Sequence, residues 1–241
     1  MLHGSGNPRF RDDDGSADPA VAAALSAFAA AQGSEHAALT ALSGARFLVP
    51  VVAVLSDDDT TEPGPATGGE KSSEMAMPTL LGRDGRAAIP VFTGMDALTR
   101  WQPTARPVPA EAIGVWQAAA QDSCAVIVDV AGPVPLAVEG ARLTALAKGQ
   151  PVPLPHEDPD VRDTVAWLLA QAAATRPPGS GQARFKLHPP SGDGDLLVEI
   201  VPPPGLNPAE ALAFATEAGS AVLDQLGARL RRGIAIAVAQ P

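Results

Sequence analysis

Residues 75–101 read MAMPTLLGRDGRAAIPVFTGMDALTRW, and this stretch decides the fold of the region around it. It contains two apolar runs, at residues 75–81 and 87–92, separated by a short polar segment. That segment contains Asp84-Gly85, a dipeptide that strongly favours a tight reversal of the chain. The pattern therefore predicts a β-hairpin that turns at Asp84-Gly85.

A short helix is predicted directly after the hairpin. Thr93 precedes Asp96 by three residues, which resembles a capping box with Asp in place of Glu. Leu98 and Trp101 follow within this helix, and Pro103 ends it because proline lacks the backbone N–H that a helix needs.

Further strands and helices are predicted on both sides of this stretch. Residues 46–55 (RFLVPVVAVL) and 124–130 (CAVIVDV) are short and rich in β-branched residues, which predicts two buried strands, the first with an edge or bulge at Pro50. Helices are predicted from Asp18-Pro19, over residues 109–121 and over residues 139–148. The order of elements before residue 150 is then α-β-β-β-α-α-β-α.

The chain after residue 149 has a pattern of its own. Proline-rich residues 150–157 precede a helix that starts at Asp158-Pro159, and residues 176–182 form a second linker. Two strands at residues 184–188 and 196–201, a helix that opens at Asn207 and a strand at residues 234–238 complete an α-β-β-α-β unit.

These elements predict an α+β protein, with a mixed sheet and packed helices in an N-terminal domain and a smaller α-β-β-α-β domain at the C-terminus. The acidic run Asp12-Asp13-Asp14 with Gly15 and Ser16 cannot bury apolar surface, so the segment around it is expected to be disordered. The predicted divisions are a tail at residues 1–17, a domain at 18–149, a linker with its helix at 150–182 and a small unit at 183–241.

Charge and composition exclude several classes of function. The formal net charge is −10 over 241 residues, and this field repels nucleic acid and anionic membrane surfaces, which are bound through clustered Lys and Arg. No apolar run approaches the roughly 20 residues of a membrane-spanning helix, and no secretory signal pattern is visible. Cys124 is the only cysteine, so an intramolecular disulfide is impossible. We expect a cytoplasmic protein that binds neither nucleic acid nor membranes.

Familiar catalytic and ligand-binding motifs are incomplete in this sequence. Gly64 and Gly69 have the spacing of a phosphate-binding loop, but Glu70 stands before Lys71-Ser72 and a strand is predicted to follow instead of a helix. The serines near Lys71 lack the S-x-x-K spacing of Ser-Lys hydrolases. The four histidines and single cysteine form no zinc pattern. We therefore expect no metal, no cofactor and no catalytic residue.

A set of basic residues is the most informative candidate for a binding site. Converging guanidinium groups bind a carboxylate, a phosphate or an acidic peptide, and a neighbouring tryptophan often anchors an interface. The alternative is that these cations pair with nearby acidic residues and that the tryptophan belongs to the core. The candidate binding residues are Lys71, Arg83, Arg86, Arg100, Trp101 and Arg106.

Two carboxylates are candidates for acid-base chemistry. Asp129 lies within an apolar strand, where a carboxylate either caps a turn, pairs with an arginine or opens into a pocket. Glu74 lies close in sequence to Lys71 and is the second candidate. An enzymatic role requires a concave pocket that holds one of these acids together with the basic set.

The sequence resembles the SseB N-terminal-domain family over residues 18–149. The resemblance rests on D-G-R-x-x-x-P-V-F-T at residues 84–93, on FLVPV at 47–51, on ARPVP at 105–109 and on VIVDVAGP at 126–133. The chain after residue 181 resembles, more weakly, the C-terminal domain of some members. The family is named after enhanced serine sensitivity, which is a phenotype and not a reaction, so the resemblance implies no catalytic residues.

Three functional hypotheses follow. The first is a non-catalytic binding or regulatory protein that contacts a protein or a small anionic ligand through the basic hairpin and helix. The second is an enzyme of unknown type that uses Asp129 or Glu74 as acid or base. The third is a secretion-associated protein. The sequence identifies neither the partner nor the oligomeric state.

Overall fold

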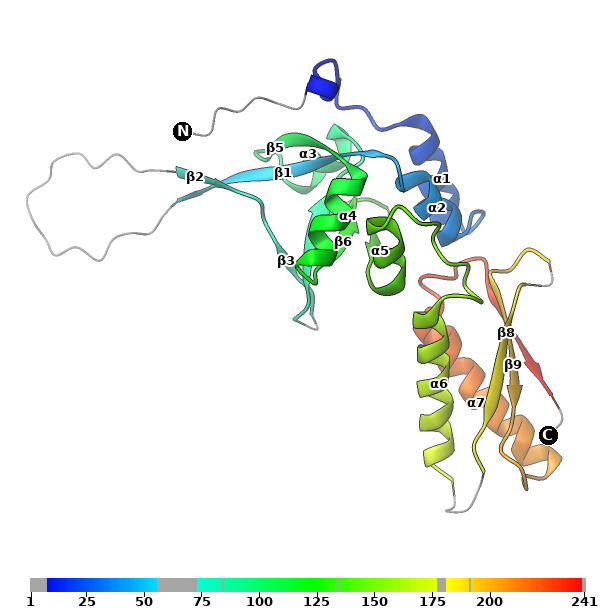
Figure 1. Cartoon of the computed structure of the whole chain (residues 1–241). Helices are drawn as coiled ribbons and strands as arrows, with labels where there is room; N and C mark the ends of the chain where they lie inside the picture. The colour runs from blue at the N-terminus through cyan, green and yellow to red at the C-terminus, as the bar shows by residue number, and fades with distance from the viewer. Residues whose placement is uncertain are drawn as a thin grey trace, which may run out of the picture. The chain divides into compact units, whose positions relative to one another are not determined.

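The computed structural model describes residues 8–55, 73–83, 85–133, 135–176, 181–190 and 192–239 (Figure 1). The chain divides into two compact units. Unit 1 comprises Met1–Pro19 and Gly44–Glu139, and unit 2 comprises Ala20–Ser43 and Gly140–Pro241. Both units contain helices and strands, which confirms the predicted α+β class.

The first sheet of unit 1 is built around one long strand. β1 (Arg46–Leu55) lies between β2 (Ser73–Ala76) and β5 (Arg106–Glu111), and pairs with both in antiparallel fashion. β5 covers the first part of β1, with Arg46 opposite Glu111 and Val51 opposite Arg106. β2 pairs with the part that follows, from Val52 onward.

The second sheet of unit 1 is mixed. Its order is β3 (Leu80–Leu81), β4 (Ala87–Val91), β6 (Ala125–Val128) and β7 (Leu136–Val138). β4 and β6 are parallel, and the other two pairs are antiparallel. An isolated bridge between Leu48 and Phe92 connects β1 to the end of β4.

The predicted hairpin is correct only at its tip. Leu80 and Leu81 pair with Ala88 and Ala87, and Gly85 has the positive φ of +78° that the reversal requires. The earlier part of the predicted strand, Ser73–Ala76, instead pairs with β1. Pro78 lies between the two pairings. Because proline has no N–H to donate to a sheet, it interrupts the run at the point where the chain changes sheets.

Two helices of unit 1 pack on opposite sides of β1. Phe47 contacts Trp116 of α4 (Ala112–Gln121) edge to face, with ring centroids 5.2 Å apart. The next residue along β1, Leu48, belongs to a buried cluster with Phe92 and with Leu98 of α3 (Met95–Trp101). Successive residues of a strand point to opposite faces, so this alternation places β1 at the centre of the unit.

The boundaries of both helices differ from the prediction. The helix predicted at 109–121 begins at Ala112, because Arg106–Glu111 pair with β1 as a strand. Residues before proline avoid the helical region, and Pro107 and Pro109 therefore favour this extended segment. Thr93 does not cap α3, whose N-cap is Gly94 with no side-chain hydrogen bond. Thr93 bonds Asp129 instead.

Unit 2 contains the α-β-β-α-β order that the sequence predicts. Its elements are α6 (Pro159–Ala174), β8 (Arg184–His188), β9 (Leu196–Val201), α7 (Pro208–Leu226) and β10 (Ile234–Val238). The strands form one sheet in the order β10-β9-β8, with β9 and β10 parallel (Figure 1). Alternate residues of β9, Leu196, Val198 and Ile200, are fully buried and pack with residues of α6 and α7.

Three further helices belong to unit 2. They are α1 (Pro19–Ala29), α2 (Glu35–Leu42) and α5 (Gly140–Ala147), of which α2 is not predicted from the sequence. Ser34 caps α2 by accepting a hydrogen bond from the backbone N–H of Ala37. The start of α7 is a full capping box between Asn207 and Glu210, which confirms the predicted helix start.

Candidate binding site in unit 1

The predicted cations fall into two groups, and Lys71 lies outside the described residues. Arg83 and Arg86 are exposed at the turn between β3 and β4, and Arg86 forms an ion pair with Glu139. Arg100 lies on α3 and Arg106 begins β5. β4 separates the two groups, and its five residues extend about 16 Å at the usual rise of a strand.

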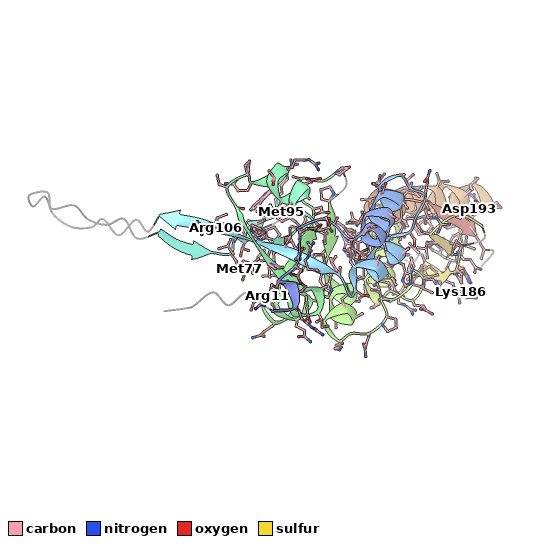
Figure 2. All side chains as sticks on the ribbon, turned by 90° about the horizontal axis from the view of Figure 1, so that it is seen from above. Arg11, Met77, Met95, Arg106, Lys186 and Asp193 are labelled. Atoms are coloured by element: carbon pink, nitrogen blue, oxygen red, sulfur yellow. The ribbon has the colours of Figure 1, made fainter. Side chains whose placement is uncertain are left out.

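Figure 1 shows this separation, because the turn after β3 and helix α3 lie at opposite ends of unit 1. The structure therefore does not bring the predicted cations into one site, because Arg83 and Arg86 lie away from Arg100 of α3. Arg106 is exposed opposite Val51, and Figure 2 places it near Met77, where β1 and β2 extend from the rest of the unit.

Trp101 combines a core contact with partial exposure. Its ring packs against that of Phe92 with centroids 5.3 Å apart and an interplanar angle of 34°. It also borders the buried cluster of Leu48 and Leu98. The side chain is half-buried, so it supports the core and still leaves part of its surface exposed.

The Asp129 carboxylate fixes the position of Thr93, which lies two residues before α3. One carboxylate oxygen accepts a hydrogen bond from the backbone N–H of Thr93 at 2.9 Å, and the other accepts one from the Thr93 hydroxyl at 2.7 Å. Asp129 itself has a positive φ of 49°, which aspartate tolerates better than most residues. Burial raises the pKa of Asp129, while the Thr93 bonds and the charge of Arg100 act in the opposite direction.

Glu74, the other acidic candidate, lies in β2 with a side chain outside the described part of the structure. Among the described residues, no group of three His, Cys, Asp or Glu lies close enough to hold a metal ion. Both oxygens of Asp129 are engaged by Thr93, so its geometry is that of a structural acceptor.

A second arginine near α3 holds a segment of the N-terminus, residues 13–17, which we call the strap. The Arg46 guanidinium lies at the start of β1, and its Nε is 2.6 Å from a carboxylate oxygen of Asp13. Its Nη1 donates to the carbonyl of Thr93 at 3.0 Å, and its Nη2 donates to the carbonyl of Ser16. One side chain thus connects the strap, β1 and the segment before α3.

The strap also contacts the first residues of α3. The backbone N–H of Met95 donates to the carbonyl of Gly15 at 2.8 Å. Gly15 is buried and has a positive φ of 78°, a conformation that glycine adopts without strain. Gly94 lies directly against the strap, because a Cβ at this position would lie 2.9 Å from the backbone nitrogen of Ala17.

Further hydrogen bonds lie within the strap. Asp13 accepts a bond from the N–H of Gly15, and Asp14 accepts bonds from both the N–H and the hydroxyl of Ser16. The bonds from Ser16 lower the pKa of Asp14. The strap is therefore a turn that its own side chains stabilise.

Open grooves flank the strap on two sides. One, of about 370 Å³, is lined by Thr93, Met95 and Arg100 together with strap residues. The other, of about 530 Å³, is lined by Arg9, Asp12 and Arg46, again with strap residues. Asp14, Ser16 and Ala17 line both grooves, so the strap is the wall between them.

Comparison with known proteins identifies the family. Residues 21–145 match the SseB protein N-terminal domain. The chain belongs to the SseB family. This confirms the resemblance in the sequence, whereas neither the curated proteins nor the solved structures contain a match. The matched SseB residues include the groove residues Arg46, Thr93 and Arg100, while the strap precedes them.

The SseB match also extends over parts of both compact units. Residues 44–139 of the match belong to unit 1, and residues 21–43 and 140–145 belong to unit 2. No helix in the described part of this SseB-family chain is both long and apolar enough to cross a bilayer.

A buried ionic cluster in unit 2 is the other polar site that the sequence does not predict. Glu35 of α2 contacts Arg142 of α5 at 2.5 Å and Arg229 at 3.2 Å. Arg229 also binds Asp158, the N-cap of α6, at 2.7 Å. Burial raises the pKa of Glu35, and the two arginines oppose this shift. Glu35, Arg142 and Asp158 are buried, so the cluster lies in the interior of unit 2.

Sequence reasoning missed Arg46 and Glu35 because nothing local distinguishes them. Arg46 precedes an apolar strand and Glu35 begins a short helix, positions at which charged residues are common. Their partners are distant in the sequence, and only the folded chain brings them together. The one available signal was Asp12-Asp13-Asp14, an acidic run followed by the turn residues Gly15 and Ser16.

Proposed function

We propose that this SseB-family protein is a non-catalytic binding or regulatory protein of the cytoplasm, which contacts an acidic region of a protein partner through α3 and β5. The proposed contact area, which we call the α3–β5 surface, comprises Arg100, Trp101, Arg106 and Val108. The observation that supports it best is that two exposed arginines, Arg100 and Arg106, lie within six residues of each other in the chain, together with the half-buried Trp101. Arginine and tryptophan are the residue types that most often dominate binding energy at interfaces.

The strand β5 adds an apolar element to this surface. Arg106 and Val108 are two residues apart and therefore lie on the same face of the strand. Both are exposed, as is Met77 next to the end of β2. A cation beside exposed apolar side chains is the usual composition of a protein–protein contact.

The separation of the cations favours a protein partner over a small anionic ligand. Guanidinium groups hold a small carboxylate or phosphate when they converge within hydrogen-bonding distance. Arg83 and Arg86 lie beyond the other end of β4, so a small ligand at α3 does not reach them. A partner protein with an extended contact area is able to reach both α3 and the turn between β3 and β4. Arg83 would then add to the binding made by the α3–β5 surface.

The observed geometry gives less support to an enzyme. A general acid or base must reach the reacting atom of a substrate. Both oxygens of Asp129 accept hydrogen bonds from Thr93, and Asp129 is not among the residues that line the two grooves. We therefore propose a structural role for Asp129.

A partner-capture experiment tests the α3–β5 surface. The tagged full-length protein is cross-linked in cells, partners are identified by mass spectrometry, and the purified partner is then titrated against the wild type. Replacing both Arg100 and Arg106 by Ala is expected to weaken binding about tenfold or more, because interface arginines each contribute about 1 kcal/mol or more.

The matched control for this pair is Arg184→Ala, which removes an exposed arginine from β8 in unit 2. Equal affinity of the wild type and the double variant would contradict the proposed surface. Cell fractionation tests the location, and recovery of the protein from the medium of intact cells would favour the secretion-associated alternative.

A further inference from the structure

Two groups bond the strap to the rest of unit 1 in the contacts described above. Its hydrogen bonds and ion pairs to the body described above come from the guanidinium of Arg46 and from the N–H of Met95. The bonds of Asp13 to Gly15 and of Asp14 to Ser16 are internal and do not depend on the body. Lifting the strap therefore breaks these bonds and its packing against Gly94 and Met95, and leaves the bonds within its own turn intact.

Release of the strap leaves a cation that needs a new partner. The Arg46 side chain is only 17% exposed, and without the strap it keeps its bond to the Thr93 carbonyl but loses the Asp13 carboxylate. A largely buried charge without a counter-charge is strongly unfavourable. The group that replaces the strap must therefore be acidic.

The surface that the strap covers holds a short peptide turn. The strap lies between the two grooves, so its removal exposes the residues that border them, Arg46 on one side and Thr93, Met95 and Arg100 on the other. Met95 then presents a free backbone N–H, and Gly94 allows close approach of another backbone. These features fit a peptide that carries a carboxylate for Arg46, a carbonyl for Met95 and a small residue opposite Gly94.

We propose that this groove binds an acidic segment of a partner protein, and that the strap is a built-in competitor which the segment displaces. The ligand is expected to be acidic because Arg46 and Arg100 are cations. The strap already presents carboxylates to this region, since Asp13 pairs with Arg46 and Asp14 lines the same groove as Arg100. The inference rests on the proposed binding function, but it depends on Arg46 and not on Arg106 of the α3–β5 surface.

The tether of the strap sets the affinity that an outside segment must overcome. A segment joined by a short linker has an effective concentration in the millimolar range. An outside peptide with the same contacts therefore binds the intact chain weakly, because its apparent affinity is reduced by the small fraction of molecules with an open groove. Weakening the strap raises that fraction and strengthens peptide binding.

The test uses a fluorescent synthetic peptide with the sequence PRFRDDDGSADP, that of residues 8–19, and the full-length protein. Fluorescence anisotropy measures binding to the wild type, to Asp13→Ala and to the control Asp12→Ala. Asp12 is the matched control because it adjoins Asp13 in the acidic run and is exposed, whereas the Asp13 carboxylate contacts Arg46. We expect Asp13→Ala to bind the peptide at least about tenfold more tightly than the wild type, and Asp12→Ala to match the wild type.

Two further measurements make the result decisive. Asp13→Asn in the full chain preserves side-chain volume and is expected to show the same direction of change, which guards against a folding defect. A peptide with Asn in place of its Asp13 is expected to bind Asp13→Ala at least about tenfold more weakly than the original peptide. Equal affinity of the Asp13 and Asp12 variants for the original peptide would overturn the inference.

The same assay separates this inference from the proposed function. Arg106→Ala in the Asp13→Ala chain is expected to retain peptide binding, because Arg106 does not line either groove. Retained peptide binding together with unchanged partner capture by the Arg100 and Arg106 double variant would support the groove and reject the α3–β5 surface. Loss of peptide binding on Arg106→Ala would reject the separate groove.

Discussion

The strap in unit 1 and the ionic cluster in unit 2 use the same chemistry for different purposes. In each, an arginine binds the carboxylate of a residue that is distant in the sequence. Glu35 and Arg142 are each 5% exposed and Asp158 is 1% exposed, whereas Arg46 and Asp13 are 17% and 12% exposed. Open grooves border the strap, while helices carry most members of the cluster.

The difference lies in what each contact leaves behind when it breaks. In the cluster, Glu35 serves two arginines, so its loss removes a shared counter-charge from two largely buried cations. In the strap, the Asp13 carboxylate serves a single arginine, Arg46, at the edge of a groove, where another carboxylate is able to replace it. Burial and sharing favour a permanent contact in the cluster, whereas the open grooves beside the strap fit the exchange that we propose for it.

The largest effect is expected from Glu35→Ala. Removing one partner of a buried ion pair costs about 3–5 kcal/mol, and here Arg142 and Arg229 both lose the counter-charge that they share. The free energy of unfolding, measured by urea denaturation, should fall by this amount. The control is Glu157→Ala, an exposed carboxylate 3.8 Å from His156, which is expected to change stability by less than about 0.5 kcal/mol. A decrease of less than about 1 kcal/mol in the free energy of unfolding for Glu35→Ala would contradict the difference drawn between the cluster and the strap.

A smaller effect is expected from Gly94→Ala. The added Cβ would lie 2.9 Å from the backbone nitrogen of Ala17, so the strap must shift. The proposed lifting of the strap predicts a cost of about 1 kcal/mol and not the full cost of overpacking a rigid core. Urea denaturation measures the stability, and heightened protease cleavage within residues 8–18 reports the released strap.

Gly114→Ala provides the matched control on α4. A Cβ at Gly114 meets no atom within 4 Å, and the helix gains stability because alanine is a better helix former. The expected change is a stabilisation of about 0.5–1 kcal/mol with no change in cleavage of the strap. If the strap of Gly94→Ala stays resistant to protease, the added Cβ does not displace the strap, and this result would contradict the proposed lifting.

The smallest effect concerns Asp129 and depends on pH. Burial raises the pKa of Asp129 in the folded state, so the folded chain holds this proton to higher pH than the unfolded chain does. Stability from this group is therefore present below the unfolded pKa and is lost as pH rises through the folded pKa. Asp129→Asn removes the dependence, so the wild type should exceed the variant in stability by more at pH 4 than at pH 7. If the stability advantage of the wild type over Asp129→Asn grows as pH rises, the pKa of Asp129 is lowered in the folded state and burial is not the dominant cause.

The strands and helices of unit 2 after residue 157 are predictable from the sequence because each signal is local. Asn207-Pro208 and Glu210 start α7, and alternating apolar residues define β9. Prediction fails where two local signals compete. In residues 106–111, Pro107 and Pro109 favour extended backbone, whereas Pro109 also suits the first position of a helix, and the pairing with β1 decides for a strand.

The candidate site was predictable only in part for a related reason. Arg100, Trp101 and Arg106 are close in the sequence, so composition alone suggests a common surface. The strap depends on Arg46, whose role arises from contacts with residues distant in the chain. The acidic run that predicts a disordered tail is also the run that supplies the counter-charge, and composition does not distinguish these two outcomes.

Amide hydrogen exchange at Met95 tests the central claim most directly. This N–H donates to the carbonyl of Gly15, so its exchange reports the opening of the strap. In NMR-detected exchange, Asp13→Ala should accelerate Met95 at least about tenfold, with Asp12→Ala and the amides of α4 unchanged. Unchanged exchange at Met95 in Asp13→Ala, or equal acceleration throughout unit 1, would show that the strap is not a separately exchangeable segment.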